Sequence, residues 1–242
     1  MRTVIVSDVH SNIEGLLAVL AHAERGGPVD ALWCTGDIVG YGPDPSAVVA
    51  ELRRRGAVCV AGNHDRAACS LLGIADFNPM AADAVIRNAA MMPDDEKAWL
   101  AALPLIGEQG HFTLVHGSLR APEWEYLLEP EQARAQFGLQ RTRFSIVGHS
   151  HLTFWVEEGE WPRFQRARDG DLLQLGERRL ILNPGSAGQP RDGDPRAAYI
   201  LYDDGAATMT WHRVEYDIAS TQAKMRAAGL DRWLAERLSA GR

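Results

Sequence analysis

Short apolar runs alternate with amphipathic segments in the first quarter of the chain. Residues 3–7 are rich in β-branched side chains, and the apolar positions between residues 13 and 20 recur at helical spacing. Apolar runs over residues 28–34 and 57–60 flank a second helical pattern that begins at Asp44-Pro45. The order strand, helix, strand, helix, strand predicts right-handed crossovers and a parallel sheet. Ligands of such sheets gather at the carboxyl ends of the strands.

Start signals predict where several helices begin. Ser11 and Glu14 have the spacing of a capping box, which places a helix start before the first apolar stripe. Residues 66–104 are alanine-rich and helical in pattern, with helix starts at Asn78-Pro79 and Pro93. We interpret them as a cap-like helical insertion within a single domain that spans residues 1–242.

The second half of the chain changes character. Residues 112–115 and 144–147 are strand patterns, separated by a helix over about residues 131–137. From residue 154 onward, repeated turn signals predict short antiparallel strands. The tail carries an apolar stripe at helical spacing, which indicates core packing or a dimer contact: Leu230, Trp233, Leu234, Leu238.

A carboxylate at the end of the second apolar run is the central candidate for chemistry. Residues 32–43 pass from an apolar run through Gly36-Asp37 into a glycine-rich loop, so Asp37 is delivered to a sheet edge. Asp8 and His10 follow the first run, and Asn63, His64 and Asp65 follow the third. In an extended chain, residues two apart face the same side, so Asp8 and His10 can reach one ion.

Histidines are concentrated at the same kind of position. Five of the eight follow apolar strand patterns, namely His10, His64, His116, His149 and His151. The other three lack this setting. Histidine, carboxylate and amide ligands without a thiolate suit Mn²⁺, Fe or Zn²⁺. Enough ligands are present for two metal sites, with Asp37 placed to belong to both.

Composition and charge narrow the range of functions. The chain has 46% hydrophobic and 24% charged residues, which is ordinary for a globular protein. A net charge of −7 disfavours nucleic-acid binding, which depends on clustered Lys and Arg. No apolar run approaches the length of a membrane span, and no signal-peptide pattern precedes residue 2. Because the three cysteines are odd in number and show no paired spacing, we expect a reducing cytoplasm.

The ligand motifs together resemble the calcineurin-like metallophosphoesterases. They stand in the order of that family: Asp8-x-His10, Gly36-Asp37, Gly62-Asn63-His64-Asp65, His116-Gly117-Ser118 and Gly148-His149-Ser150-His151. Two further segments resemble its small prokaryotic phosphodiesterase branch, residues 40–45 and Asn183-Pro184-Gly185-Ser186. The resemblance implies an α/β fold with four αββα layers, in which two facing mixed sheets are flanked by helices.

The resemblance also implies roles for individual residues. One ion would be held by Asp8, His10, Asp37 and His151, and the other by Asp37, Asn63, His116 and His149. His64 would be a general acid or a transition-state contact, with Asp65 orienting its ring. Asn12 stands where the family often keeps a polar residue near the phosphate. The cofactors would be two divalent ions, with Mn preferred and Fe, Zn or Ni as alternatives.

A polar loop supplies candidates for substrate contact. Arg191 and Arg196 could bind phosphate oxygens in bidentate fashion, although a solvated loop explains the segment equally well. Tyr41, Phe77 and Asn78 are weaker candidates for the pocket wall.

These features favour a phosphodiesterase, in which a hydroxide bridging the two ions attacks phosphorus. The alternatives are a phosphomonoesterase, a dinucleoside polyphosphate hydrolase and, from another class, a non-catalytic interaction scaffold. The expected partner is a small phosphoester substrate, with no membrane or nucleic acid and with a homo-oligomer as an open option.

Overall fold

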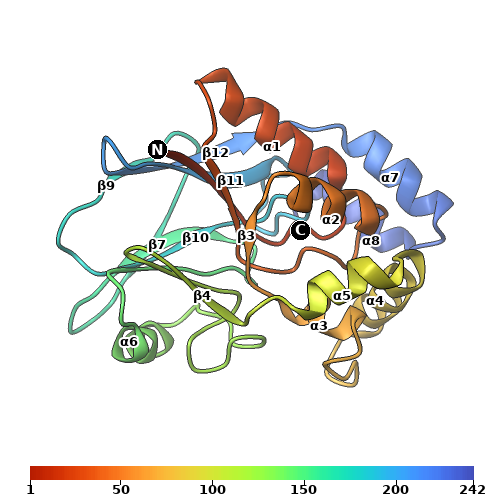
Figure 1. The fold of residues 1–242 in the computed structure, drawn as a ribbon, viewed down its shortest axis with the longest axis horizontal. Coiled ribbons are helices and arrows are strands. Elements are labelled where there is room, and N and C mark those ends of the chain that lie inside the picture. Colours follow the sequence, from red (N-terminus) through yellow and green to blue (C-terminus); the bar gives the residue numbers. More distant parts are fainter.

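The predicted strands and helices assemble into two sheets with helices outside them (Figure 1). The computed structural model describes all residues, 1–242. The first sheet has the order β3-β2-β1-β11-β12-β9. Its strands are β1 (Arg2–Val6), β2 (Ala31–Cys34), β3 (Val58–Cys59), β9 (Leu172–Gln174), β11 (Ala197–Asp203) and β12 (Thr208–Val214).

The second sheet has the order β4-β5-β6-β10-β7-β8. Its strands are β4 (Ile106–Gln109), β5 (Phe112–Val115), β6 (Phe144–Ile146), β7 (Thr153–Glu157), β8 (Phe164–Arg166) and β10 (Leu180–Pro184). Both sheets are mixed. β1, β2 and β3 run parallel, as the strand and helix alternation predicts, whereas β11 and β12 pair antiparallel.

Eight α-helices and one 3₁₀-helix surround the sheets. They are α1 (Ile13–Arg25), α2 (Pro45–Arg54), α3 (Asn63–Ala68), α4 (Pro79–Met91), α5 (Asp94–Ala101), α6 (Pro130–Leu139), α7 (Ile218–Ala227), α8 (Arg232–Glu236) and η1 (Arg237–Ala240). Most lie on the right of Figure 1, and α6 lies alone at the lower left. Two of the predicted turns join antiparallel partners, β7 with β8 and β11 with β12, whereas those after β8 and β9 lie in connections to the other sheet. The helix α7 and the edge strand β4 were not predicted.

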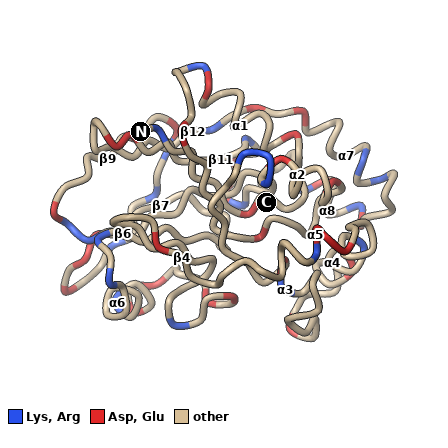
Figure 2. The backbone as a smooth tube through the Cα atoms, viewed as in Figure 1, with Lys and Arg blue, Asp and Glu red and all other residues tan.

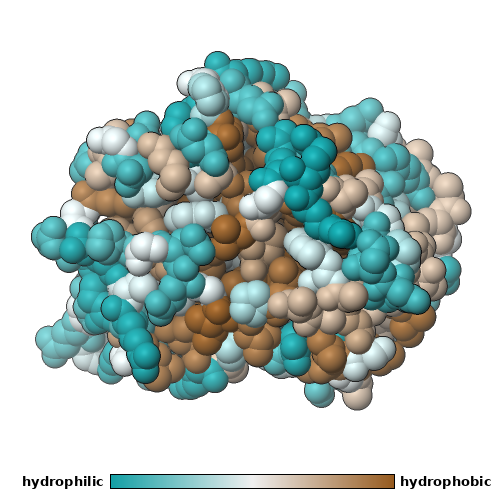
Figure 3. All heavy atoms as spheres, viewed as in Figure 1, coloured by the Kyte–Doolittle hydropathy of each residue, from teal (hydrophilic) through white to brown (hydrophobic).

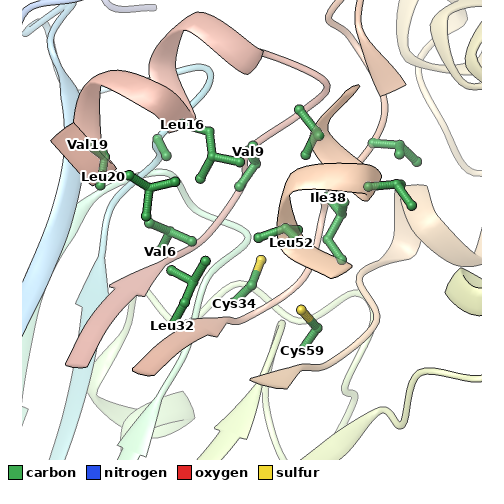
Figure 4. Packing of buried hydrophobic residues seen from close by; sticks show 14 of the residues in the cluster. Val6, Val9, Leu16, Val19, Leu20, Leu32, Cys34, Ile38, Leu52 and Cys59 are labelled. Carbon is green, nitrogen blue, oxygen red and sulfur yellow. The ribbon is translucent and has the colours of Figure 1, made fainter. Parts of the chain in front are cut away.

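Three apolar contacts hold four layers together. Leu16 and Leu20 of α1 and Leu52 of α2 pack on Val6 and Leu32 of the first sheet (Figure 4). Side chains from both sheets form a second cluster between them, with Trp33 and Trp211 facing Phe112 and Phe144. Ala133 and Phe137 of α6 cover the outer side of the second sheet. This arrangement confirms the predicted αββα fold class.

Two helix starts differ from the sequence expectation. The cap of α1 is Asn12 rather than Ser11, because the Asn12 side chain accepts a hydrogen bond from the Gly15 amide at 3.0 Å. Ser11 instead donates to Asn88 Oδ1 at 2.5 Å. Asp44 precedes α2 as predicted but makes no capping hydrogen bond, and its carboxylate pairs with Lys224 at 2.9 Å.

Charged and apolar side chains are mixed over the surface. Figure 2 shows basic and acidic positions interspersed along the chain, without a long stretch of one sign. In Figure 3, hydrophobic residues reach the surface across the middle of the visible face, between hydrophilic residues. No helix has both the length and the apolar character that crossing a membrane requires.

Candidate metal centre and active site

The predicted ligands lie in turns that follow the strands, and most adopt an unusual backbone conformation. Positive φ angles occur at Asp8 (51°), His10 (47°), Asp37 (50°), His149 (65°) and His151 (58°). These are five of the nine non-glycine residues with positive φ in the chain. Such conformations cost free energy and cluster at functional sites. They also correct the extended-chain argument for Asp8 and His10, whose side chains converge through left-handed turns instead.

One group of ligands combines Asp8, His10 and His151. The two histidine Nε2 atoms lie 3.1 Å apart, and His151 Nε2 lies 3.2 Å from Asp8 Oδ1. All three side chains are buried. We call these residues the first cluster.

A second group gathers Asn63, His116 and His149. His116 Nε2 lies 3.2 Å from Asn63 Oδ1 and 3.1 Å from His149 Nδ1. We call these residues the second cluster. Asp37 lies between the two clusters, because its Oδ2 is 3.6 Å from His10 Nε2 and 3.3 Å from His116 Nε2. This is the position that a carboxylate shared by two ions requires.

The donor atoms fit divalent ions. Two ligands bonded to one ion at about 2.1 Å and at right-angled to tetrahedral geometry lie about 3.0–3.4 Å apart, close to most of the observed separations. Asp8 Oδ1 is buried without a hydrogen-bond partner. A buried carboxylate oxygen without a partner is costly, so a cation beside it would relieve that cost. The seven predicted ligands therefore form two groups that could each hold a metal ion.

Backbone carbonyls hold three of the histidine rings. The Nδ1 atoms of His10, His116 and His151 lie 3.1, 2.9 and 2.5 Å from the carbonyl oxygens of Val39, Thr35 and Gln189. A hydrogen on Nδ1 leaves Nε2 with a free lone pair directed at the cluster, and this arrangement is usual for metal-binding histidines. His149 differs, because its Nδ1 faces the cluster and its buried Nε2 has no partner.

Burial and mutual charge shift the pKa values of the ligands. Burial opposes ionisation of Asp37, but His116 and His64 outweigh it and hold the pKa of Asp37 well below its usual range. Burial also opposes the charged form of His116, yet Asp37 raises its pKa to about 9. Burial and the neighbouring His116 lower the pKa of His149 to about 3. Carboxylates and neutral imidazoles are the forms that bind metal.

His64 lies beside the ligands at the start of α3. One of its ring nitrogens falls in one group with His10 and Asp37. His64 and Asp37 line a cavity with a volume of about 100 Å³. Gly40, with φ of +95°, permits this placement, because a Cβ atom there would lie 2.2 Å from His64 Nδ1. Burial lowers the pKa of His64 to about 4.

Asp65 does not have the contact that was predicted for it. Its two carboxylate oxygens accept the amides of Val39 at 3.0 Å and Gly62 at 2.9 Å, while His64 Nδ1 has no partner. Asp65 therefore fixes the loops around Asp37 instead of orienting the His64 ring. Burial and the nearby Asp37 raise its pKa to about 7.

Two of the three predicted substrate contacts lie outside the cavity. Asn12 is 1% exposed, caps α1 and donates to the Gly188 carbonyl at 2.8 Å, so its side chain serves the fold. The Arg196 guanidinium is bound by Asp194 at 2.7 Å and Asp169 at 2.8 Å. Arg191, in contrast, lines the cavity together with ligand side chains.

Aromatic side chains form much of the cavity wall. Tyr41, Phe77 and Asn78 line it, as the sequence predicted for the pocket wall, and so do Trp124 and Tyr126. The Tyr126 ring stacks on His149 with centroids 4.0 Å apart and planes 22° apart. Phe77 and Asn78 lie between α3 and α4, so this segment contributes one wall of the cavity. Trp124 and Tyr126 were missed because no pattern links an irregular loop to the strand ends.

Asn88 of α4 is a third residue that sequence reasoning missed. It is completely buried, accepts from Ser11 Oγ at 2.5 Å and from the Gly40 amide at 2.7 Å, and donates to the Gly42 carbonyl at 3.0 Å. It thereby ties the helical insertion to the loops that follow β1 and β2. The signal that the sequence offered was a single polar residue on the otherwise apolar face of a helix, since the other buried residues of α4 are apolar.

Comparisons with known proteins agree with this geometry. The model of the calcineurin-like phosphoesterase superfamily domain matches residues 1–205. An uncharacterised protein of Methanocaldococcus jannaschii is 35% identical over 98% of this chain and 97% of its own length. The crystal structure of a metallophosphoesterase from Sphaerobacter thermophilus covers 100% of the chain and is itself covered to 99%, with 42% identity and a TM-score of 0.90. A symmetrical bis(5'-nucleosyl)-tetraphosphatase of Klebsiella pneumoniae is 29% identical over 55% of this chain and 49% of its own length.

Proposed function

The chain belongs to the calcineurin-like phosphoesterase superfamily and is a phosphoric ester hydrolase, and we propose that it cleaves phosphodiesters at a centre of two divalent ions. The position of Asp37 Oδ2 between the two clusters supports two ions above all. Two such ions would polarise phosphoryl oxygens and activate water as a nucleophile. Mn²⁺ is the preferred ion in this proposal, with Fe, Zn²⁺ and Ni²⁺ as alternatives.

The chain's own residues would bind and orient the substrate. Arg191 is the one cavity-lining arginine, and its guanidinium can bind a phosphoryl oxygen in bidentate fashion. The aromatic wall formed by Phe77, Trp124 and Tyr126 would exclude water from one side of the reacting group. Such a wall also suits an organic substituent, which favours diesters over small monoesters.

His64 is proposed to give a proton to the leaving oxygen. Because burial lowers its pKa to about 4, the proposal requires the negative charge of a bound phosphoryl group to raise that pKa. Its ring lies in the cavity, and the ligand function on α3 already belongs to Asn63. Substitution His64→Ala should then cost about 10²–10⁴ in rate on alkyl esters, whose leaving groups need a proton. Nitrophenyl esters should lose much less. Equal losses on both esters would leave an electrostatic contact only, and loss of bound metal would make His64 a ligand.

Hydrolysis of dinucleoside polyphosphates is a second candidate function. The K. pneumoniae relative is named for this reaction, although the match spans about half of its length. The cavity also combines an arginine with several aromatic side chains. A non-catalytic scaffold would not require the metal ligands, whereas this chain keeps all seven of them and His64.

Turnover after removal and return of metal tests the proposal. The protein is stripped with a chelator, reloaded with Mn²⁺, and assayed on bis(p-nitrophenyl) phosphate, p-nitrophenyl phosphate and a dinucleoside tetraphosphate. We expect activity only after reloading, two ions per chain, and faster diester than monoester turnover. His111→Ala, at an exposed histidine outside the site, is the matched control. Full activity with one ion per chain would refute the dinuclear centre.

A further inference from the structure

Arg191 lines the cavity, Arg237 lies next to it, and neither has an aspartate or glutamate partner. Arg191 lies with its guanidinium carbon 5.5 Å from the centre of the Tyr41 ring. Its Nη2 donates to Gln189 Oε1 at 3.0 Å, and its Nε is buried without a partner. The Arg191 guanidinium therefore has hydrogen-bond donors without a partner in the protein.

Arg237 of η1 approaches the same acceptor from the C-terminal helices. Its Nη1 donates to Gln189 Oε1 at 3.2 Å, so one neutral oxygen accepts from both guanidinium groups. The Arg237 guanidinium lies 4.4 Å from the centre of the Trp233 ring, and its Nε donates to the main-chain oxygen of Arg242, the last residue of the sequence. Burial and the like charge of Arg191 lower the pKa of Arg237 to about 10.

Neighbouring arginines are neutralised, which makes this pair distinctive. Arg213 is paired with Asp192, and Arg196 with Asp194, so the acidic side chains of this loop are already engaged. Arg191 and Arg237 are two adjacent positive charges without an aspartate or glutamate partner, in a chain of net charge −7. Two partly buried like charges that share one neutral oxygen destabilise each other unless an anion joins them.

Gln189 connects this pair to the metal centre. The residue is 1% exposed, and its backbone carbonyl holds Nδ1 of His151 in the first cluster. Its Nε2 is buried without a partner. Gln189 therefore links the arginine pair to the first cluster. Its side-chain oxygen accepts from both guanidinium groups, and its backbone carbonyl contacts the ring of His151. In Figure 1, α7 and α8, which precede η1, lie on the same side of the molecule as α1.

We propose that Arg191 and Arg237 form a second phosphate subsite, which binds a phosphoryl group of the substrate other than the one that is cleaved. Guanidinium forks bind phosphoryl oxygens in bidentate fashion, and two of them would take one such group. The substrate class is then an ester that carries at least two phosphoryl groups. This inference rests on the proposed function. Arg237 lies beyond the residues that the family model matches, 1–205, so the subsite depends on the C-terminal helices of this chain.

Substitution Arg237→Gln tests whether the protein binds a second phosphoryl group of the substrate in addition to the one that is cleaved. Its matched control is Arg232→Gln, a change on the same helical segment at a side chain that is 86% exposed and pairs with Glu236. We expect Arg237→Gln to raise KM for a dinucleoside tetraphosphate about tenfold or more, as loss of a charged hydrogen bond does. KM for bis(p-nitrophenyl) phosphate, which has one phosphorus, should stay within about twofold of the parent, and so should kcat.

Binding of tripolyphosphate to the metal-loaded protein, measured by calorimetry, gives a readout without turnover. Arg237→Gln should weaken tripolyphosphate about tenfold and leave orthophosphate unchanged. Arg191→Gln should weaken both, because Arg191 also lines the cavity beside the predicted metal ligands, where orthophosphate would bind. Equal KM changes on both esters would show that Arg237 only positions the loop, and unchanged tripolyphosphate binding would also overturn the subsite. If Arg237→Gln unfolds, Arg237→Lys replaces it, with a smaller loss expected from a single charge. A parent without esterase activity would refute the proposed function, while the titration would still decide the subsite.

Discussion

The two clusters lie on either side of Asp37 but differ in how the fold holds their histidines. In the first cluster, backbone carbonyls of Val39 and Gln189 hold both rings, His10 and His151. In the second cluster only His116 is held in this way, by the carbonyl of Thr35. His149 is held instead by stacking under Tyr126. Stacking fixes the plane of a ring but does not select which nitrogen carries the hydrogen.

The clusters also differ in protonation. Burial lowers the pKa values of His10 and His151, so the first cluster is ready for a cation at neutral pH. In the second cluster, the charge of Asp37 overcomes burial and raises the pKa of His116 to about 9. The second ion must therefore displace a proton. We conclude that the first cluster is the better preorganised of the two.

The largest effect should come from the residue that the clusters share. Asp37→Ala should weaken both ions together and reduce diesterase activity by more than about 100-fold, because even partners of metal ligands affect activity by 10–100-fold. Elemental analysis of the dialysed variant, alongside kinetics, measures this. A variant that keeps one tightly bound ion would show that Asp37 belongs to one cluster only.

Substitutions in single clusters should separate the two ions. His151→Ala should leave the ion of the second cluster, and His149→Ala should leave the ion of the first, so each variant should bind one ion instead of two. Calorimetric titration with Mn²⁺ gives the stoichiometry, and His111→Ala again serves as the control. Loss of both ions from either variant would mean that the clusters cannot be filled independently.

The sequence predicted which side chains converge, because strand ends are local features. Each ligand follows an apolar run, and parallel strands bring their carboxyl ends to one edge. Asp37 lies between the two groups, the position expected of a carboxylate that belongs to both. The fold class was also predicted, through the family resemblance of the motifs.

What the sequence did not reveal depends on distant packing. The left-handed conformations of Asp8 and His10 arise from loops that meet across strands, and no propensity indicates them. Arg196 and Arg191 look equivalent in sequence, yet Arg196 is engaged by Asp169, which is 27 residues away in the chain. Likewise, Arg237 reaches Gln189 across 48 residues of the chain.

The pH dependence of metal binding should distinguish the clusters. In His151→Ala, Mn²⁺ affinity at the second cluster should rise about tenfold for each pH unit up to about 9, the pKa of His116, since binding releases one proton below that value. In His149→Ala, affinity at the first cluster should stay nearly constant above pH 6.5. Equilibrium dialysis between pH 6.5 and 8.5 measures both. Parallel pH profiles would contradict the difference in protonation.

The smallest expected effect tests the stacking of Tyr126 on His149. An aromatic pair contributes about 0.5–1.5 kcal/mol, so Tyr126→Ala should weaken the ion of the second cluster about 2- to 12-fold. Tyr126→Phe keeps the ring and should bind this ion as the parent does. Measuring both variants in a His151→Ala background isolates the second cluster, and repeating them with His149→Ala should show no change at the first. If Tyr126→Phe loses as much affinity as Tyr126→Ala, the hydroxyl and not the stacked ring supports the cluster. If neither substitution changes affinity, His149 is held by its own backbone turn, and the two clusters are equally preorganised.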